Sequence, residues 1–175
     1  MAEHAKKIKQ GSGIFADTQI GLLVSIEQQN RVLGYIEKGL NEGAQLVTGG
    51  NKPQEQGYFV SPTIFADVRD EMTIAKEEIF GPVIAAMPYD DIDELINRAI
   101  NSEYGLAAGV WTRDVATAHY ISSKLRAGSV WVNCYNAFDA ASPFGEYKQS
   151  GMGREMGSYA LNNYTEVKSV WISMQ

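Results

Sequence analysis

The stretch VIAAMPYDDIDELINRAINSEYGLAAGVWTRDVATAHYISSKLRAGSVWV, residues 83–132, alternates short apolar runs with amphipathic ones. The short runs have the texture of buried strands: 83–87, 105–111 and 129–132. The runs between them have helical periodicity: 92–101 and 115–125. Asp90-Asp91 and Asp114 are suitable N-caps for these two helices. Strand, helix, strand, helix, strand is a βαβαβ unit, which predicts an α/β fold with an open, mostly parallel sheet and flanking helices.

The sequence before this stretch predicts a further helix and two further strands. Ser25 and Gln28 have the spacing of a capping box, and the residues up to 41 carry an apolar stripe: Val32, Leu33, Ile36 and Leu40. Residues 45–48 read as a strand, and 58–64 as an edge or irregular strand because Pro62 interrupts it. Residues 51–57 between them predict a polar surface loop.

The sequence after this stretch is different in character. Residues 133–157 are rich in Gly, Ser and aromatic residues, and a loop of that length in a compact domain is usually functional. A short helix is predicted at 158–163. Residues 165–172 alternate apolar and polar side chains, which predicts a half-buried or edge strand able to pair with another chain.

Composition excludes several classes of protein. Of the 175 residues, 45% are hydrophobic and 21% charged, an ordinary globular balance. Fifteen Lys and Arg against 21 Asp and Glu give a net charge of −6, so the basic surface of a nucleic-acid or membrane binder is not expected. The single cysteine and two histidines argue against a disulfide framework and a metal centre. A reduced cytoplasmic setting fits best.

The segment EEIFGPV, residues 77–83, is the densest local signal for chemistry. A carboxylate can accept both hydrogens of a vicinal diol, and an aromatic ring two residues on can pack against a flat ligand. The alternative is a solvated acidic turn followed by a phenylalanine of the core, which spacing alone favours. Both interpretations stay open at this point.

Three other features carry weaker signals. Cys134 could act as a nucleophile, but it follows an apolar strand, where a free cysteine is usually a small buried hydrophobe. The glycine-rich segment 151–157 lacks the spacing of a phosphate loop and predicts a turn into a helix. Phe138 and Phe144 either anchor their loop or line an apolar ligand pocket.

Taken together, these segments resemble the aldehyde dehydrogenase family. TIAKEEIFGPV at 73–83 resembles the family's nicotinamide-ribose motif, and NSEYGLAAGV at 101–110 resembles its recurrent turn into a sheet strand. GSVWVN at 128–133, followed by SPFG at 142–145, resembles its C-terminal block. The resemblance covers essentially the whole chain and implies oxidation of aldehydes to carboxylic acids with NAD or NADP, NAD being favoured.

The resemblance also implies roles for individual residues. Glu78 would bind the hydroxyls of the nicotinamide ribose, and Phe80 would pack beside the nicotinamide end of the cofactor. Gln28 and Arg31 match positions that approach the adenosine ribose. Phe138 and Phe144 match walls of the aldehyde tunnel.

The resemblance further implies that residues 1–163 are the C-terminal portion of the family's catalytic domain and that 164–175 are an oligomerisation tail strand that joins subunits. The nucleophilic cysteine and the glutamate base of the family match no position in this chain. We therefore expect no catalytic residue in it and no activity from it alone. The alternative is a non-catalytic truncated homologue that acts as an assembly or interaction module through its terminal strand.

Overall fold

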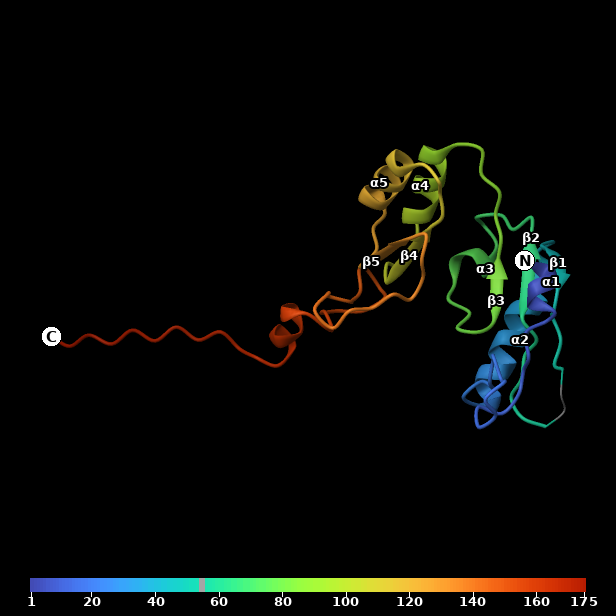
Figure 1. Cartoon of the computed structure of the whole chain (residues 1–175), viewed down its shortest axis with the longest axis horizontal. Coiled ribbons are helices and arrows are strands. Elements are labelled where there is room, and N and C mark those ends of the chain that lie inside the picture. Colours follow the sequence, from blue (N-terminus) through green and yellow to red (C-terminus); the bar gives the residue numbers. More distant parts are fainter. Residues whose placement is uncertain (54–55) are drawn as a thin grey trace. The chain divides into compact units, whose positions relative to one another are not determined.

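The computed structural model describes residues 1–53 and 56–175, which form two compact units, 1–88 and 89–175 (Figure 1). Each unit has its own sheet and its own apolar core. The polar loop predicted at 51–57 includes residues 54 and 55, which lie outside the described residues. Across the part of the chain that is described, no helix is long and apolar enough to span a membrane.

The first unit combines a three-stranded sheet with one long helix. Its elements are α1 (Ala2–Ala5), α2 (Ile26–Asn41), β1 (Gln45–Thr48), β2 (Thr63–Ala66), α3 (Thr73–Lys76) and β3 (Val83–Ala85). β2 lies in the middle, antiparallel to β1 and parallel to β3. The predicted cap of α2 is confirmed, because the Ser25 hydroxyl accepts a hydrogen bond from the Gln28 N–H at 3.2 Å.

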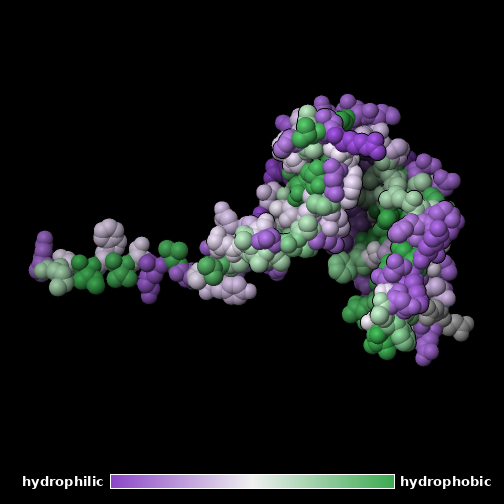
Figure 2. All heavy atoms as spheres, in the orientation of Figure 1, coloured by the Kyte–Doolittle hydropathy of each residue, from purple (hydrophilic) through white to green (hydrophobic). Residues whose placement is uncertain are grey.

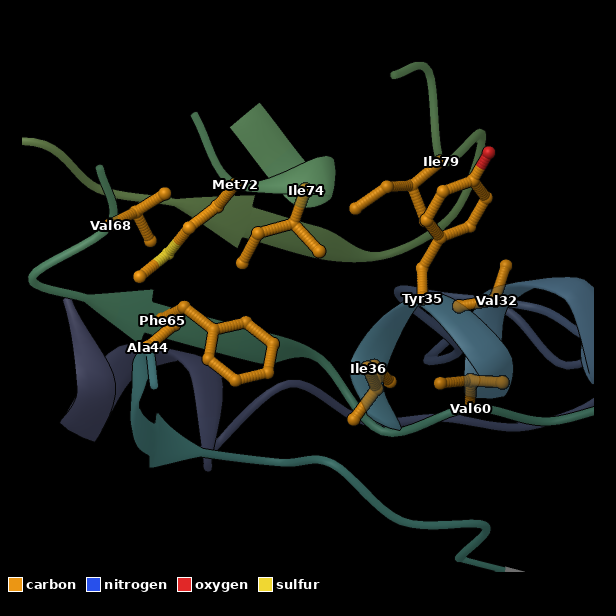
Figure 3. Packing of buried hydrophobic residues seen from close by; sticks show 10 residues of the cluster. All are labelled: Val32, Tyr35, Ile36, Ala44, Val60, Phe65, Val68, Met72, Ile74 and Ile79. Atoms are coloured by element: carbon orange, nitrogen blue, oxygen red, sulfur yellow. The ribbon is translucent and has the colours of Figure 1, made fainter. Parts of the chain in front are cut away.

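The core of this unit lies between α2, the sheet and the segment around α3 (Figure 3). Its buried members are Val32, Tyr35, Ile36, Ala44, Val60, Phe65, Val68, Met72, Ile74 and Ile79. The predicted stripe of α2 is correct at Val32 and Ile36, whereas Leu40 is 46% exposed. Gly39 takes the inward position instead, since a Cβ there would lie 2.9 Å from the Ile74 side chain.

The second unit carries a parallel pair of strands covered by helices. Its elements are α4 (Ile92–Ile100), β4 (Ala107–Val110), α5 (Val115–Lys124), β5 (Ser129–Val132) and the 3-10 helix Ser158–Asn163. β4 and β5 pair in parallel, α5 contacts both strands, and α4 contacts α5. The predicted caps are confirmed: the Asp91 carboxylate accepts from the Glu94 N–H, and the Asp114 carboxylate accepts from two N–H groups of its helix.

The α/β class and the parallel pairing of β4 with β5 are confirmed. The edge strand predicted at 58–64 is wrong in its bounds and its place, because β2 begins at Thr63, directly after Pro62, and lies in the middle of its sheet. The pairing partner of β3 differs from a single βαβαβ sheet, because β3 lies beside β2 and not beside β4. The connection from β2 to β3 contains α3 and is itself a parallel crossover, whose Met72 and Ile74 are buried in the core of the first unit.

The strand predicted at 165–172 is not formed in this structure. Among the described residues, 165–175 carry no helix or strand, and no other segment pairs with their backbone. A strand needs a neighbour for its N–H and C=O groups, which explains the difference. The apolar side chains of this tail are exposed, Val167 to 99% and Trp171 to 95%, and Figure 2 shows hydrophobic residues along it.

Candidate functional site

The loop formed by residues 77–80 follows α3 and leads through Gly81-Pro82 into β3. Ile79 points into the core and is 9% exposed, whereas the Phe80 ring is 74% exposed. Phe80 has a φ of +54°, a left-handed conformation that non-glycine residues adopt only when their surroundings hold them. With this backbone conformation the Ile79 side chain is buried in the core, and the next side chain, Phe80, is exposed to solvent.

Two side chains of α2 hold the backbone of this loop. The Gln28 amide Nε2 donates to the Ile79 carbonyl at 3.2 Å and to the Phe80 carbonyl at 2.9 Å. The Arg31 guanidinium donates to the Glu78 carbonyl at 3.0 Å. The structure therefore brings Gln28 and Arg31 together with Glu78 and Phe80, and it does so through the main chain of the loop.

The two adjacent glutamates have different surroundings. The Tyr35 hydroxyl donates to the Glu77 carboxylate at 2.7 Å, and Figure 3 shows the Tyr35 ring beside Ile79. This hydrogen bond, with burial as the second cause, raises the pKa of Tyr35 above its ordinary value. The Glu78 side chain is exposed, and within residues 1–53 and 56–175 no donor of the protein binds its carboxylate.

Of the second interpretation of the segment 77–83, the solvated acidic turn agrees with the structure, because the Glu78 side chain is exposed. A phenylalanine of the core is wrong, because the buried residue is Ile79 and Phe80 is largely exposed. The Glu78 carboxylate is exposed and has lone pairs available to a ligand. It lies two residues from the exposed Phe80 ring, on a loop whose carbonyls accept hydrogen bonds from Gln28 and Arg31. Such a pair can bind a diol that is attached to a flat ring.

A second group of predicted residues comes together in the second unit. Trp131, Phe138 and Phe144 stack edge to face, with ring centroids 5.5 Å and 5.2 Å apart for successive pairs. They line a cavity of about 330 Å³, together with polar side chains of Ser129, Asp139 and Ser142. The Trp131 indole N–H also donates to the Ala137 carbonyl at 2.8 Å and ties the loop to β5. Phe138 and Phe144 thus line one open cavity, whose exposed surface is more polar than apolar.

The expectation that Cys134 is a small buried hydrophobe is wrong, because this cysteine is exposed. The cause is the residue before it. Asn133 has a φ of +54°, and its side chain bonds the Thr112 N–H and carbonyl at 3.0 Å and 2.9 Å. The chain therefore turns out of the sheet directly after β5. In the part of the chain that the structure describes, no cluster of three or more His, Cys, Asp or Glu side chains could hold a metal ion.

The sequence analysis did not single out Tyr35 and Glu77 as partners. A signal for Tyr35 was present, because positions 28, 31 and 35 lie on one face of a helix. No comparable signal pointed to Glu77, which lies 42 residues further along the chain.

The fold and these two groups of residues define an α/β protein with a helix-held acidic loop in one unit and an aromatic cavity in the other. The profile of the Aldehyde dehydrogenase family matches residues 1–170. The chain belongs to the aldehyde dehydrogenase family. The protein DhaS of Bacillus subtilis is 68% identical over 175 residues, which are 100% of this chain and 35% of that protein.

Solved structures agree with this assignment. An aldehyde dehydrogenase from Bacillus cereus in complex with NAD⁺ has a TM-score of 0.94 and 57% identity, covering 99% of this chain and 35% of that one. A Staphylococcus aureus betaine aldehyde dehydrogenase in complex with NAD⁺ has a TM-score of 0.89 and 38% identity, covering 93% of this chain and 33% of that one. The chain thus spans about a third of the length of the relatives that it matches.

Proposed function

We propose that this chain is the C-terminal portion of an NAD-dependent aldehyde dehydrogenase, which oxidises aldehydes to carboxylic acids. The observation that carries the proposal is that Glu78 and Phe80, two residues apart, are both exposed on a loop whose backbone is held by α2. The family membership and the NAD⁺ complexes of the B. cereus and S. aureus proteins support it, and the latter favour NAD over NADP.

The residues present fit the nicotinamide half of such a cofactor. The Glu78 carboxylate has acceptors for both hydroxyls of a ribose, and the Phe80 ring offers an apolar surface to the adjoining base. When bound, NAD accepts the hydride that the aldehyde loses. The part of this chain in that chemistry is to hold the ribose and to orient the ring. Gln28 and Arg31, for which the resemblance implies an approach to the adenosine ribose, bind the carbonyls of this loop.

We further propose that the cavity lined by Trp131, Phe138 and Phe144 receives the aldehyde. Edge-to-face contacts hold its three aromatic rings against one another. The polar groups of Ser129 and Ser142 lie in the same cavity. No residue of this chain is assigned as nucleophile or general base, so the chain alone is proposed to be inactive.

The tail is the remaining part of the proposal. Residues 164–175 are proposed to join subunits, in contrast to residues 1–163, which belong to the catalytic domain. The exposed apolar side chains of Val167 and Trp171 support this role, and they equally support the second function, an assembly module without catalysis. Light scattering on the whole chain tests both, and a strict monomer at high concentration contradicts them.

The lone cysteine supports a cytoplasmic setting.

The activity is tested in a hybrid enzyme, in which this chain replaces the matching segment of the B. cereus aldehyde dehydrogenase. The hybrid is expected to form NADH from NAD⁺ and an aldehyde, whereas the chain alone forms none. Glu78→Gln removes the charge that strengthens both ribose hydrogen bonds, so the KM for NAD⁺ should rise about tenfold. Glu37→Gln, an exposed glutamate on α2, is the matched control. An unchanged KM in Glu78→Gln, or steady NADH formation by the chain alone, contradicts the proposal.

A further inference from the structure

Gln28, Arg31 and Tyr35 lie on one face of α2, at positions i, i+3 and i+7. We call these three residues the loop clamp. Their donors reach four successive residues of the loop. Tyr35 binds the Glu77 carboxylate, Arg31 binds the Glu78 carbonyl, and Gln28 binds the carbonyls of Ile79 and Phe80. One helix face therefore contacts every residue of 77–80.

The rest of the surroundings act in the same direction. Ile79 anchors the loop in the core beside Val32 and Tyr35. At Gly81 the backbone lies so close to α2 that a Cβ would be 2.5 Å from the Val32 side chain. The left-handed conformation of Phe80 is unfavourable by itself and persists where several contacts enforce it. The clamp supplies two such contacts at the carbonyls on either side of the Phe80 nitrogen and α-carbon.

We infer that the loop clamp positions Glu78 and Phe80 for the nicotinamide half of NAD, so that Gln28 and Arg31 act on the cofactor through the loop. The inference rests on the proposed function. Its physical basis is that Gln28 and Arg31 donate to main-chain carbonyls of the loop, which leaves the Glu78 carboxylate and the Phe80 ring exposed. A fixed backbone lets these two side chains bind without a further loss of conformational freedom.

The clamp is tested in the hybrid enzyme with Gln28→Met and Arg31→Met, which keep length and helix propensity but remove the donors. Each variant is expected to raise the KM for NAD⁺ about tenfold, with the KM for aldehyde changed by less than about twofold. Arg31→Lys retains a donor for the Glu78 carbonyl and should restore most of the loss. Asn30→Ala, on an exposed position of the same helix, is the control and should match the unchanged hybrid.

A double-mutant cycle with Glu78→Gln separates positioning from direct contact. Arg31 binds the Glu78 carbonyl, so if it acts through Glu78, Arg31→Met in the Glu78→Gln background changes the KM for NAD⁺ by less than about twofold. If Arg31 touches the cofactor itself, the two effects multiply, and the inference is overturned.

A readout without cofactor keeps the inference apart from the proposed function. Lys76 is exposed at the start of the loop, so trypsin cleavage after it reports local opening. The two Met variants should be cleaved about threefold faster or more there, while Asn30→Ala is not. An effect on cleavage with no effect of Glu78→Gln on the KM contradicts the proposed function and leaves the clamp standing. Unchanged cleavage and unchanged KM overturn the clamp. If Gln28→Met does not fold, the Arg31→Met and Arg31→Lys pair decides.

Discussion

The loop 77–80 of the first unit and the loop 133–144 of the second are held by different forces. Polar side chains of α2 hold the first by its main chain, and only Ile79 of that loop is buried. Aromatic side chains of the second loop pack against one another and against Trp131, with one indole hydrogen bond to the backbone. The first arrangement fixes the backbone, and the second fixes the side chains.

The difference matches what each loop can bind. A loop held by its carbonyls leaves its own side chains available, and Glu78 and Phe80 are both exposed. A loop held by its rings uses those side chains as walls, and the result is a cavity of about 330 Å³. Polar recognition of a diol suits the first loop, whereas the second loop offers a cavity in which aromatic rings and polar groups lie together.

The glycines at the base of the two loops should give the largest effects. A Cβ on Gly128 would lie 1.6 Å from the Gly145 carbonyl oxygen, so the main chain must move, and Gly128→Ala should lower the unfolding free energy by more than about 4 kcal/mol. A Cβ on Gly81 meets the Val32 side chain, and Gly81→Ala should lower it by about 1–3 kcal/mol. Urea unfolding of the chain, followed by circular dichroism, measures both.

The control for this pair is Gly34→Ala. Gly34 lies inside α2 with nothing within 4 Å of the added methyl group, so alanine should stabilise the chain by about 0.5–1 kcal/mol. If Gly81→Ala lowered the unfolding free energy more than Gly128→Ala does, the main chain of the first loop would be held more rigidly than that of the second.

The aromatic loop gives an intermediate effect. Trp131→Phe removes the hydrogen bond to the Ala137 carbonyl and part of the contact with Phe138, which together should lower stability by about 1–2 kcal/mol. In the hybrid enzyme it should raise the KM for aldehyde and leave the KM for NAD⁺ unchanged, the opposite of the clamp variants. A rise in the KM for NAD⁺ alone would show that the two loops are not specialised in this way.

Features that depend on neighbouring residues could be predicted from the sequence. Ser25, Asp91 and Asp114 cap the helices as expected, because a cap is decided within one helical turn. The bounds of β5 also match the predicted 129–132, because Gly128 and Asn133 mark the two ends of a short apolar run.

Features that depend on distant partners could not be predicted. The exposure of Phe80 follows from a backbone conformation enforced by Gln28, which lies 52 residues away in the sequence. The role of Tyr35 likewise depends on Glu77. Cys134 is exposed because Asn133 bonds Thr112, which follows β4, a contact that requires the register of the two strands. Side-chain spacing names the donors on a helix face, but not the carbonyls that they reach.

The smallest expected effect is a pH dependence of the loop clamp. The pKa of Tyr35 is raised, first by its hydrogen bond to Glu77, so its contribution to stability is fully present below the ordinary pKa of tyrosine, about 10. It is lost as the pH rises through the raised value, because the phenolate cannot donate and repels the Glu77 carboxylate. The stability difference between the unchanged chain and Tyr35→Phe should therefore shrink in alkali, as urea unfolding at a series of pH values measures.

Tyr120→Phe is the matched control, because Tyr120 donates to Asp93 at 2.5 Å, its pKa is raised in the same direction, and it lies outside the clamp. Faster trypsin cleavage after Lys76 at high pH should occur in the unchanged chain and in Tyr120→Phe but not in Tyr35→Phe, and equal acceleration in all three would contradict a role for the Tyr35 proton in holding the loop.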